Sequence, residues 1–135
     1  MDPKFLKDML SHCLDADLVF GSRYITGGGS DDDDLVTFTG NKIFTFLGNI
    51  LFSLNLSDIL YTYVLGKTNS IKKLSLKNKD FRIFVEIPIK AKKHNLKYKT
   101  LPSMERKRIG GKKKVSAIKD GFLILIAVIV LFLKK

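Results

Sequence analysis

The sequence predicts a single small domain of the α/β class. Short segments rich in β-branched and aromatic residues, such as residues 18–20 and 61–66, alternate with longer segments whose apolar residues recur at helical spacing. A chain of 135 residues can bury a core without disulfide bonds, and the only cysteine, Cys13, excludes an internal disulfide. A hydrophobic content of 45% argues against a wholly disordered chain.

The first quarter of the chain predicts a helix, a strand and a loop. Residues 4–14 follow Pro3, which suits a first helical turn, and their apolar residues have helical spacing. Residues 18–20 predict a short buried strand that ends in a Gly-Ser-Arg-Tyr turn. Residues 26–34, with three consecutive glycines and four consecutive aspartates, predict a solvated loop.

The middle of the chain predicts a long apolar helix over residues 41–54, with Thr39 as a candidate cap. One broad face of this helix would carry Ile43, Phe44, Leu47, Ile50, Leu51 and Leu54. Residues 57–58 predict either a turn or a helix cap, and residues 61–66 a strand that ends at a glycine. Residues 71–76 fit a short helix or a strand equally well.

The last part of the chain predicts two more helices with a strand and a basic loop between them. Residues 81–94 read as a helix in which Pro88 marks a kink or a late start. Residues 97–101 alternate polar and apolar residues as a strand does, and residues 105–114 form a basic loop. A final helix would carry one apolar stripe made of Val115, Ile118, Phe122 and Leu125.

Residues 122–133 are consecutively apolar. A helix of that length spans about 18 Å at about 1.5 Å per residue, whereas a bilayer core needs about 30 Å. The segment is therefore short for a spanning helix and fits one that lies in the interface, docks on the domain or begins a longer membrane region. A core helix is the alternative, and the preceding basic block favours membrane association. We accordingly divide the chain at residues 1–116 and 117–135.

The net charge of +11 is unevenly distributed. Residues 1–66 carry a net −5, residues 67–119 carry +15 and the remainder carries +1. A basic block of this density attracts phosphate, whether on lipid headgroups, a nucleotide sugar or nucleic acid. Nucleic acid is the least favoured of these partners, because no aromatic residue for base stacking lies between Tyr98 and Phe122.

Three polar features are candidates for chemistry. Arg23 follows a predicted strand, where a guanidinium could grip phosphate, although a surface arginine packed on Tyr24 is the simpler interpretation. Asp58 could act as a general base or share a metal, or it could be a helix cap. The four aspartates at 31–34 lack the spacing of metal ligands, so no metal ligand is predicted.

The densest basic segment, residues 105–114, places six cations around a glycine pair. It could wrap a pyrophosphate or contact a nucleic-acid backbone.

The order of these motifs resembles that of family 2 glycosyltransferases, in particular the polyprenyl-phosphate mannosyl- and glucosyltransferases. The resemblance rests on residues 17–24, on the glycine-rich loop, on residues 40–49, on Ser57-Asp58 with 61–64, on residues 84–86, and on residues 101–115 and 119–122. It implies the acceptor-side, C-terminal half of a GT-A-like nucleotide-sugar transferase fold, followed by an apolar C-terminal helix, at the cytoplasmic face of a membrane.

In that family a sugar passes from a nucleotide donor to a lipid phosphate or another acceptor. The resemblance implies that Asp58 lies near the metal or serves as the base, and that the phosphates are contacted by Arg23, Asn41, Lys42, Arg106, Arg108, Lys112 and Lys113. Asn41 stands where some members carry arginine, and Lys42 beside it would substitute in part.

This chain differs from the family in one respect, the metal-binding motif of the donor side. The complete enzymes bind Mg or Mn through an Asp-x-Asp motif in a preceding nucleotide-binding half, and Asp15-Ala-Asp17 directly precedes a strand instead. We therefore expect the isolated chain to be inactive and to be a fragment, a split-gene product that needs a partner chain, or a degenerate relative. The alternative hypothesis is a non-enzymatic basic module that binds anionic membrane or nucleic acid.

Overall fold

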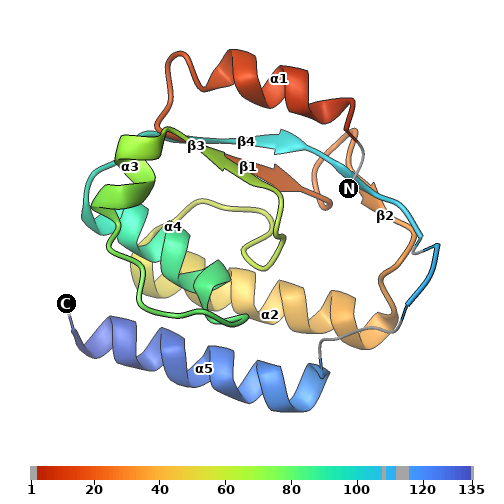
Figure 1. Ribbon diagram of the computed structural model, residues 1–135. Coiled ribbons are helices and arrows are strands. Elements are labelled where there is room, and N and C mark those ends of the chain that lie inside the picture. The colour runs from red at the N-terminus through yellow and green to blue at the C-terminus, as the bar shows by residue number, and fades with distance from the viewer. Residues whose placement is uncertain (1–2, 108, 112–115, 135) are drawn as a thin grey trace.

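The computed structural model describes residues 3–107, 109–111 and 116–134, and these form a mixed α/β fold (Figure 1). Its elements are, in chain order, α1 (Phe5–His12), β1 (Leu18–Ser22), β2 (Gly29–Ser30), α2 (Leu35–Phe52), β3 (Val64–Gly66), α3 (Thr68–Lys73), α4 (Ile83–Lys93), β4 (Tyr98–Pro102), β5 (Met104–Glu105) and α5 (Ala117–Leu133). The predicted α/β class is confirmed at this level, and the GT-A-like fold stays a prediction.

The sheet has three strands in the order β3-β1-β4. The central strand β1 runs antiparallel to β3 and parallel to β4, so Val19 lies opposite both Leu65 and Lys99. Beyond Ser103, the chain forms a second, two-stranded parallel pair between β2 and β5. In Figure 1, α1 covers one face of the sheet, whereas α2, α4 and α5 lie on the other face.

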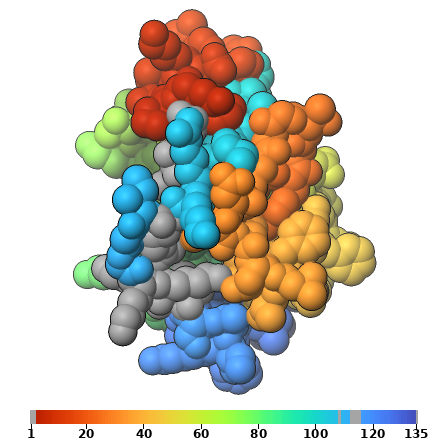
Figure 2. Space-filling model, turned by 90° about the vertical axis from the view of Figure 1, so that its right-hand side faces the viewer, coloured from red at the N-terminus to blue at the C-terminus, as the bar shows by residue number. Residues whose placement is uncertain are grey.

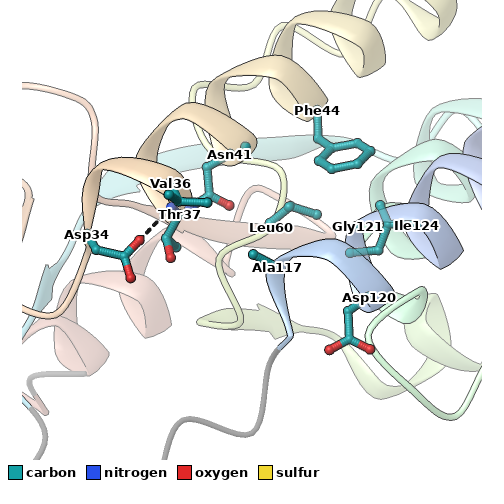
Figure 3. A pocket seen from close by; sticks show the side chains of 11 residues that line it. Asp34, Val36, Thr37, Asn41, Phe44, Leu60, Ala117, Asp120, Gly121 and Ile124 are labelled. Atoms are coloured by element: carbon teal, nitrogen blue, oxygen red, sulfur yellow. Dashed lines mark hydrogen bonds between the residues drawn. The ribbon is translucent and has the colours of Figure 1, made fainter.

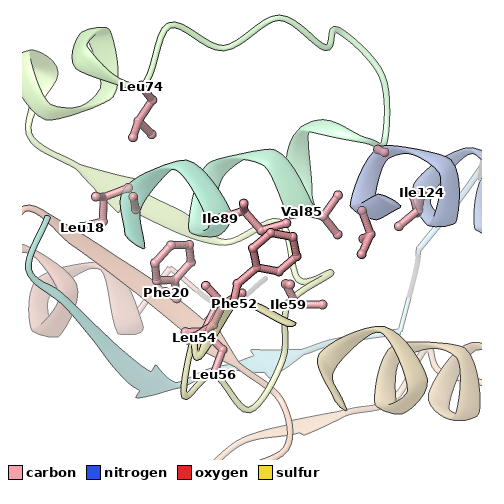
Figure 4. Packing of buried hydrophobic residues seen from close by; sticks show 13 residues of the cluster. Leu18, Phe20, Phe52, Leu54, Leu56, Ile59, Leu74, Val85, Ile89 and Ile124 are labelled. Atoms are coloured by element: carbon pink, nitrogen blue, oxygen red, sulfur yellow. The ribbon is translucent and has the colours of Figure 1, made fainter. Parts of the chain in front are cut away.

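The main core lies between the sheet and the layer of α2, α4 and α5 (Figure 4). Side chains of a strand alternate between its two faces, so Leu18 and Phe20 join this core while Val19 packs with Met9 and Ala16 under α1. Ile124 and Val128 of α5 are buried in the same main core.

Several predicted elements are confirmed with small changes of their bounds. The helix after Pro3 is α1, the strand at 18–20 is β1 and extends to Ser22, and residues 61–66 contain β3. The helix at 81–94 is α4 with Pro88 inside it, and the strand at 97–101 is β4. The ambiguous segment at 71–76 is resolved as a helix, α3, which begins at Thr68.

The prediction for α2 was wrong at its start and on its buried face. The helix begins at Leu35 because the Asp34 side chain accepts a hydrogen bond from the Thr37 backbone N–H at 2.7 Å, and Thr39 lies inside the helix. Residues on the buried side are Asn41, Thr45, Gly48 and Phe52. Of the predicted apolar face, Ile43 and Ile50 are 53% and 62% exposed, whereas Phe44, Leu51 and Leu54 join or pack against the main core. A helix that is apolar on nearly every side does not reveal which side its neighbours cover.

The apolar stripe predicted for α5 is not the side of the helix that the structure buries. Ser116 caps the helix, since its hydroxyl accepts from Lys119 N–H. Ile118 and Phe122 of the predicted stripe are 88% and 63% exposed, and the buried side carries Ile124, Ala127 and Val128 instead. Val115 lies outside the described residues.

Candidate functional site

Arg23 lies at the carboxyl end of β1, at the centre of a buried ionic cluster. Its Nε donates to Asp58 Oδ2 at 2.7 Å and its Nη2 donates to Asp58 Oδ1 at 3.0 Å, which makes a bidentate pair. Its Nη1 donates to Asp33 at 3.1 Å and to Glu105 at 2.9 Å. The side chains of Arg23 and Asp58 are 5% and 0% exposed.

Four separate segments bring this cluster together. Arg23 follows β1, Asp33 precedes α2, Asp58 lies in the connection between α2 and β3, and Glu105 ends β5. The pairing of β2 with β5 places the aspartate loop beside residues 104–105, and the orange and cyan segments lie next to each other in Figure 2. These residues lie far apart in the sequence, so no local pattern predicts that they meet.

Hydrogen bonds hold the connection that carries Asp58. The Thr45 hydroxyl accepts from Ile59 N–H at 3.1 Å, and Ser57 Oγ donates to Ser22 Oγ at 2.7 Å. Asp58 also accepts from the Arg23 backbone N–H at 3.2 Å. No helix begins at Asp58, so its interpretation as a helix cap was wrong, and its side chain serves to hold Arg23.

Aromatic rings sandwich the guanidinium. The guanidinium carbon lies 4.7 Å from the centroid of the Tyr61 ring and 5.0 Å from that of Tyr24. The Tyr24 hydroxyl donates to Asp33 at 2.5 Å and accepts from Asn41 Nδ2 at 3.0 Å. The predicted packing of Arg23 on Tyr24 is present, but Arg23 is buried rather than on the surface.

The cluster keeps Arg23 charged. Burial by itself would lower the pKa of the Arg23 guanidinium, but the hydrogen bonds and the negative charge of Asp58, with help from Glu105, outweigh burial and raise that pKa. Burial raises the pKa of the Asp58 carboxyl, and the hydrogen bonds from Arg23 offset part of that effect. Three carboxylates surround one guanidinium, so a phosphate could reach Arg23 only if a carboxylate moved away.

The structure joins one of the other predicted site residues to this cluster. Asn41 is buried and reaches it through Tyr24, whereas Lys42 is exposed and its ammonium lies 4.6 Å from the centroid of the Tyr24 ring. Arg106 is exposed and directly follows Glu105. Arg108, Lys112 and Lys113 lie outside the described residues.

The four consecutive aspartates do not form a freely solvated loop as predicted. Asp33 binds Arg23 and Tyr24, and Asp34 caps α2. Within residues 3–107, 109–111 and 116–134, no group of three histidine, cysteine or acidic side chains is arranged to hold a metal ion. Asp15 pairs with Lys99, and Asp17 accepts from Ser70 and from Lys97 N–H, so the described residues do not fit the metal that the family resemblance implies.

A groove extends from the ionic cluster toward α5. A cavity of about 150 Å³ borders Arg23, Glu105 and Tyr61, and a second cavity of about 300 Å³ lies between α2 and α5. The two cavities share Thr37, Asn41, Leu60 and Ile124 in their walls. In Figure 3 the second cavity, here named the α2–α5 slot, lies between Asn41 and Phe44 on one side and Gly121 and Ile124 on the other.

Two members of the cluster were missed by the sequence reasoning. Glu105 is the only acidic residue between 97 and 119, and that isolation was a usable signal. Asp33 had no comparable signal, because it is one of four identical neighbours.

No family model matches this chain, and no curated protein matches it either. The geometry by itself defines a mixed α/β protein in which Arg23 and three carboxylates form a buried ionic cluster. A cavity beside this cluster adjoins the α2–α5 slot.

Proposed function

We propose that this chain is the acceptor-side part of a family 2 glycosyltransferase, which holds a polyprenyl phosphate while a sugar is transferred to it from a nucleotide donor. The proposal joins the order of motifs in the sequence to one observation, the groove that runs from Arg23 to the α2–α5 slot. Arg23 at one end suits a phosphate, and Val36, Phe44, Leu60 and Ile124 in the slot suit an isoprenoid chain, with Asp34 and Asp120 also in the slot's lining.

The polar end requires a rearrangement before phosphate can bind. Glu105 is the most exposed of the three carboxylates at Arg23, with 27% of its side chain accessible, and it sits at the end of a two-residue strand. Its departure would free one N–H of Arg23 Nη1, while Asp33 kept the other and Asp58 held the rest of the guanidinium in place. Asp58 thus acts as a positioning residue in this proposal, and its role as a base stays a prediction.

The apolar surface of α2 and α5 supports a location at a membrane, at the cytoplasmic face as the resemblance implies. Among the described residues, eighteen large apolar side chains are exposed, and six of them lie on α2 and eight on α5. The two helices pack together, with the rings of Phe52 and Phe132 at 6.0 Å. Apolar exposure on this scale is typical of a surface that contacts protein or lipid.

By length and composition, α2 is the one described helix that could cross a bilayer, a criterion that core helices also meet. Because α2 supplies Phe52 to the core, we propose that α2 and α5 lie along the membrane surface.

The sugar nucleotide and its Mg or Mn ion would be bound by residues other than those described, on this polypeptide or on a separate chain. A transfer assay with nucleotide sugars and Mn checks this point. Turnover by the isolated chain, after contamination by another transferase had been excluded, would contradict the need for further residues.

The direct test is binding of undecaprenyl phosphate, with undecaprenol as the control lipid, in phosphatidylcholine nanodiscs. Gly40→Leu should fill the α2–α5 slot, because a Cβ at Gly40 meets no atom within 4 Å. We expect affinity for the phosphate to fall by about tenfold or more, equivalent to about 1.4 kcal/mol. Thr39→Leu adds the same side chain one residue away, outside the slot, and should bind normally. Equal binding of the alcohol and the phosphate would refute the proposal.

A non-enzymatic module that binds anionic membrane is the second candidate, and the lysine-rich surface of α4 favours it. Binding that is independent of the polyprenyl phosphate, and that falls steeply with salt, would select this candidate. Retention of nucleic acid under the same salt series would instead select the nucleic-acid alternative.

A further inference from the structure

A second groove lies on the opposite side of α5, between α4 and the C-terminal half of α5. It encloses about 410 Å³. It shares no lining residue with the groove at Arg23 or with the α2–α5 slot. Its described lining contains none of the residues to which the glycosyltransferase resemblance gives a catalytic or phosphate-binding role.

One wall of this α4–α5 groove is cationic. Lys77, Arg82, Lys90 and Lys93 line it, and Lys134 closes the end. Lys93 caps the end of α5, since its ammonium donates to Leu131 O at 2.7 Å. Among the described residues, no acceptor lies within hydrogen-bonding distance of the ammonium groups of Lys77 and Lys134, so both are available to a ligand.

Among the described lining residues of this groove, Glu86 is the one carboxylate, and its oxygens already have hydrogen-bond donors. Glu86 is 1% exposed and accepts from Lys77 N–H, Asn78 N–H and the Asn78 side chain at 2.8–2.9 Å. Lys90 pairs with it at 2.7 Å. Asp80 pairs with Arg82 outside the groove lining. The groove therefore keeps a net positive charge that these carboxylates do not neutralise.

The other wall is apolar and partly open. Ile126 and Val130 of α5 line it and are 40% and 39% exposed, and the sequence has no charged residue between Gly121 and Leu133. A free phosphate would use the cationic wall alone, whereas an anionic amphiphile would use both walls. The apolar wall also continues into the exposed side of α5, at Ile129 and Leu133.

We propose that the α4–α5 groove binds an anionic phospholipid of the bilayer, with the headgroup phosphate on the cationic wall and an acyl chain along α5. The cationic wall suits the headgroup phosphate of such a lipid, and the apolar wall suits its acyl chain. The inference rests on the proposed membrane contact of α5 and is independent of sugar transfer. Lipid binding there would fix the orientation of the protein about the α5 axis relative to the membrane, because the lipid site lies on one flank of that helix.

The test uses the full chain with dihexanoyl-phosphatidylglycerol below its micellar concentration, and with vesicles of phosphatidylcholine that contain a minor fraction of phosphatidylglycerol. Wild type should bind the short-chain lipid saturably. Lys77→Gln with Lys134→Gln should weaken binding by about tenfold. Lys7→Gln with Lys92→Gln removes the same charge outside the groove lining and should weaken binding much less.

A third variant separates a lipid site from an anion site. Val130→Trp should fill the groove and abolish saturable binding while every lysine remains. Circular dichroism and thermal unfolding verify that each variant is folded. Equal affinity for inorganic phosphate, or vesicle binding without saturable binding of the short-chain lipid, would overturn the proposal.

The two proposed sites can fail separately. Gly40→Leu should leave phosphatidylglycerol binding unchanged, since Gly40 lines only the slot on the other side of α5. A wild-type chain that bound phosphatidylglycerol but not undecaprenyl phosphate would refute only the glycosyltransferase assignment.

Discussion

Arg23 and Asp58 form a bidentate ion pair from which water is almost excluded, with donor–acceptor distances of 2.7 and 3.0 Å. The pair links the end of the central strand to the connection between α2 and β3. It also aims the remaining nitrogen of the guanidinium, Nη1, at Asp33 and Glu105. Stability and the proposed phosphate site therefore depend on the same two residues.

Removal of Asp58 should destabilise the protein strongly. Asp58→Ala leaves a buried guanidinium without its main partner, and breaking a buried pair in this way typically costs about 3–5 kcal/mol. Urea denaturation measures the change. Asp80→Ala breaks the exposed pair with Arg82 and should alter stability little. Similar losses in the two variants would contradict the structural role of Asp58.

Neutralising Glu105 should favour the phosphate-binding state. Glu105→Gln removes one of the three negative charges around Arg23, so we expect the affinity for undecaprenyl phosphate in nanodiscs to rise several-fold. Asp31→Asn makes the same change of net charge at an exposed position and should not raise it. Unchanged or weaker binding in Glu105→Gln would argue against displacement of this carboxylate.

Two glycines in α2 should respond in opposite directions to alanine. A Cβ at Gly48 would lie 2.6 Å from Ile59 Cδ1 and 3.2 Å from Leu54 Cδ1, so Gly48→Ala should destabilise by about 1–3 kcal/mol. Gly40 has open space, and Gly40→Ala should stabilise by about 0.5–1 kcal/mol through helix propensity. Thermal unfolding of both variants checks the packing of α2 against residues 54–59.

The Glu86 carboxyl should make stability depend on pH. Burial would raise its pKa, but hydrogen bonds from Lys90, Asn78 and the Lys77 N–H outweigh burial and hold the pKa below its ordinary value of 4.5. A carboxyl with a lowered folded-state pKa contributes stability above its unfolded-state pKa and loses it as the pH falls through the folded-state pKa.

Glu86→Gln should therefore lower stability at neutral pH and flatten the acid limb of the profile below about pH 4.5. Denaturant unfolding across this range measures both effects. An acid limb as steep as that of wild type would show that other carboxyls dominate it.

The sequence predicted the helix after Pro3, the strand at 18–20 and the helix around Pro88, because each has a local pattern of apolar spacing or a local cap. It also singled out Arg23 and Asp58 as residues of interest. It failed for the faces of α2 and α5, since apolar residues surround both helices and local spacing cannot indicate which side is covered.

What the sequence by itself determined is the α/β class, the uneven charge and the apolar character of the last helix. Only the tertiary structure decided that Arg23 is enclosed by Asp33, Asp58 and Glu105 and that α5 has a groove on each flank. The physical reason is that the ion pairs of Arg23 with Asp58 and Glu105 join residues 35 and 82 positions apart. Strand pairing and burial bring such residues together, and no local pattern records those contacts.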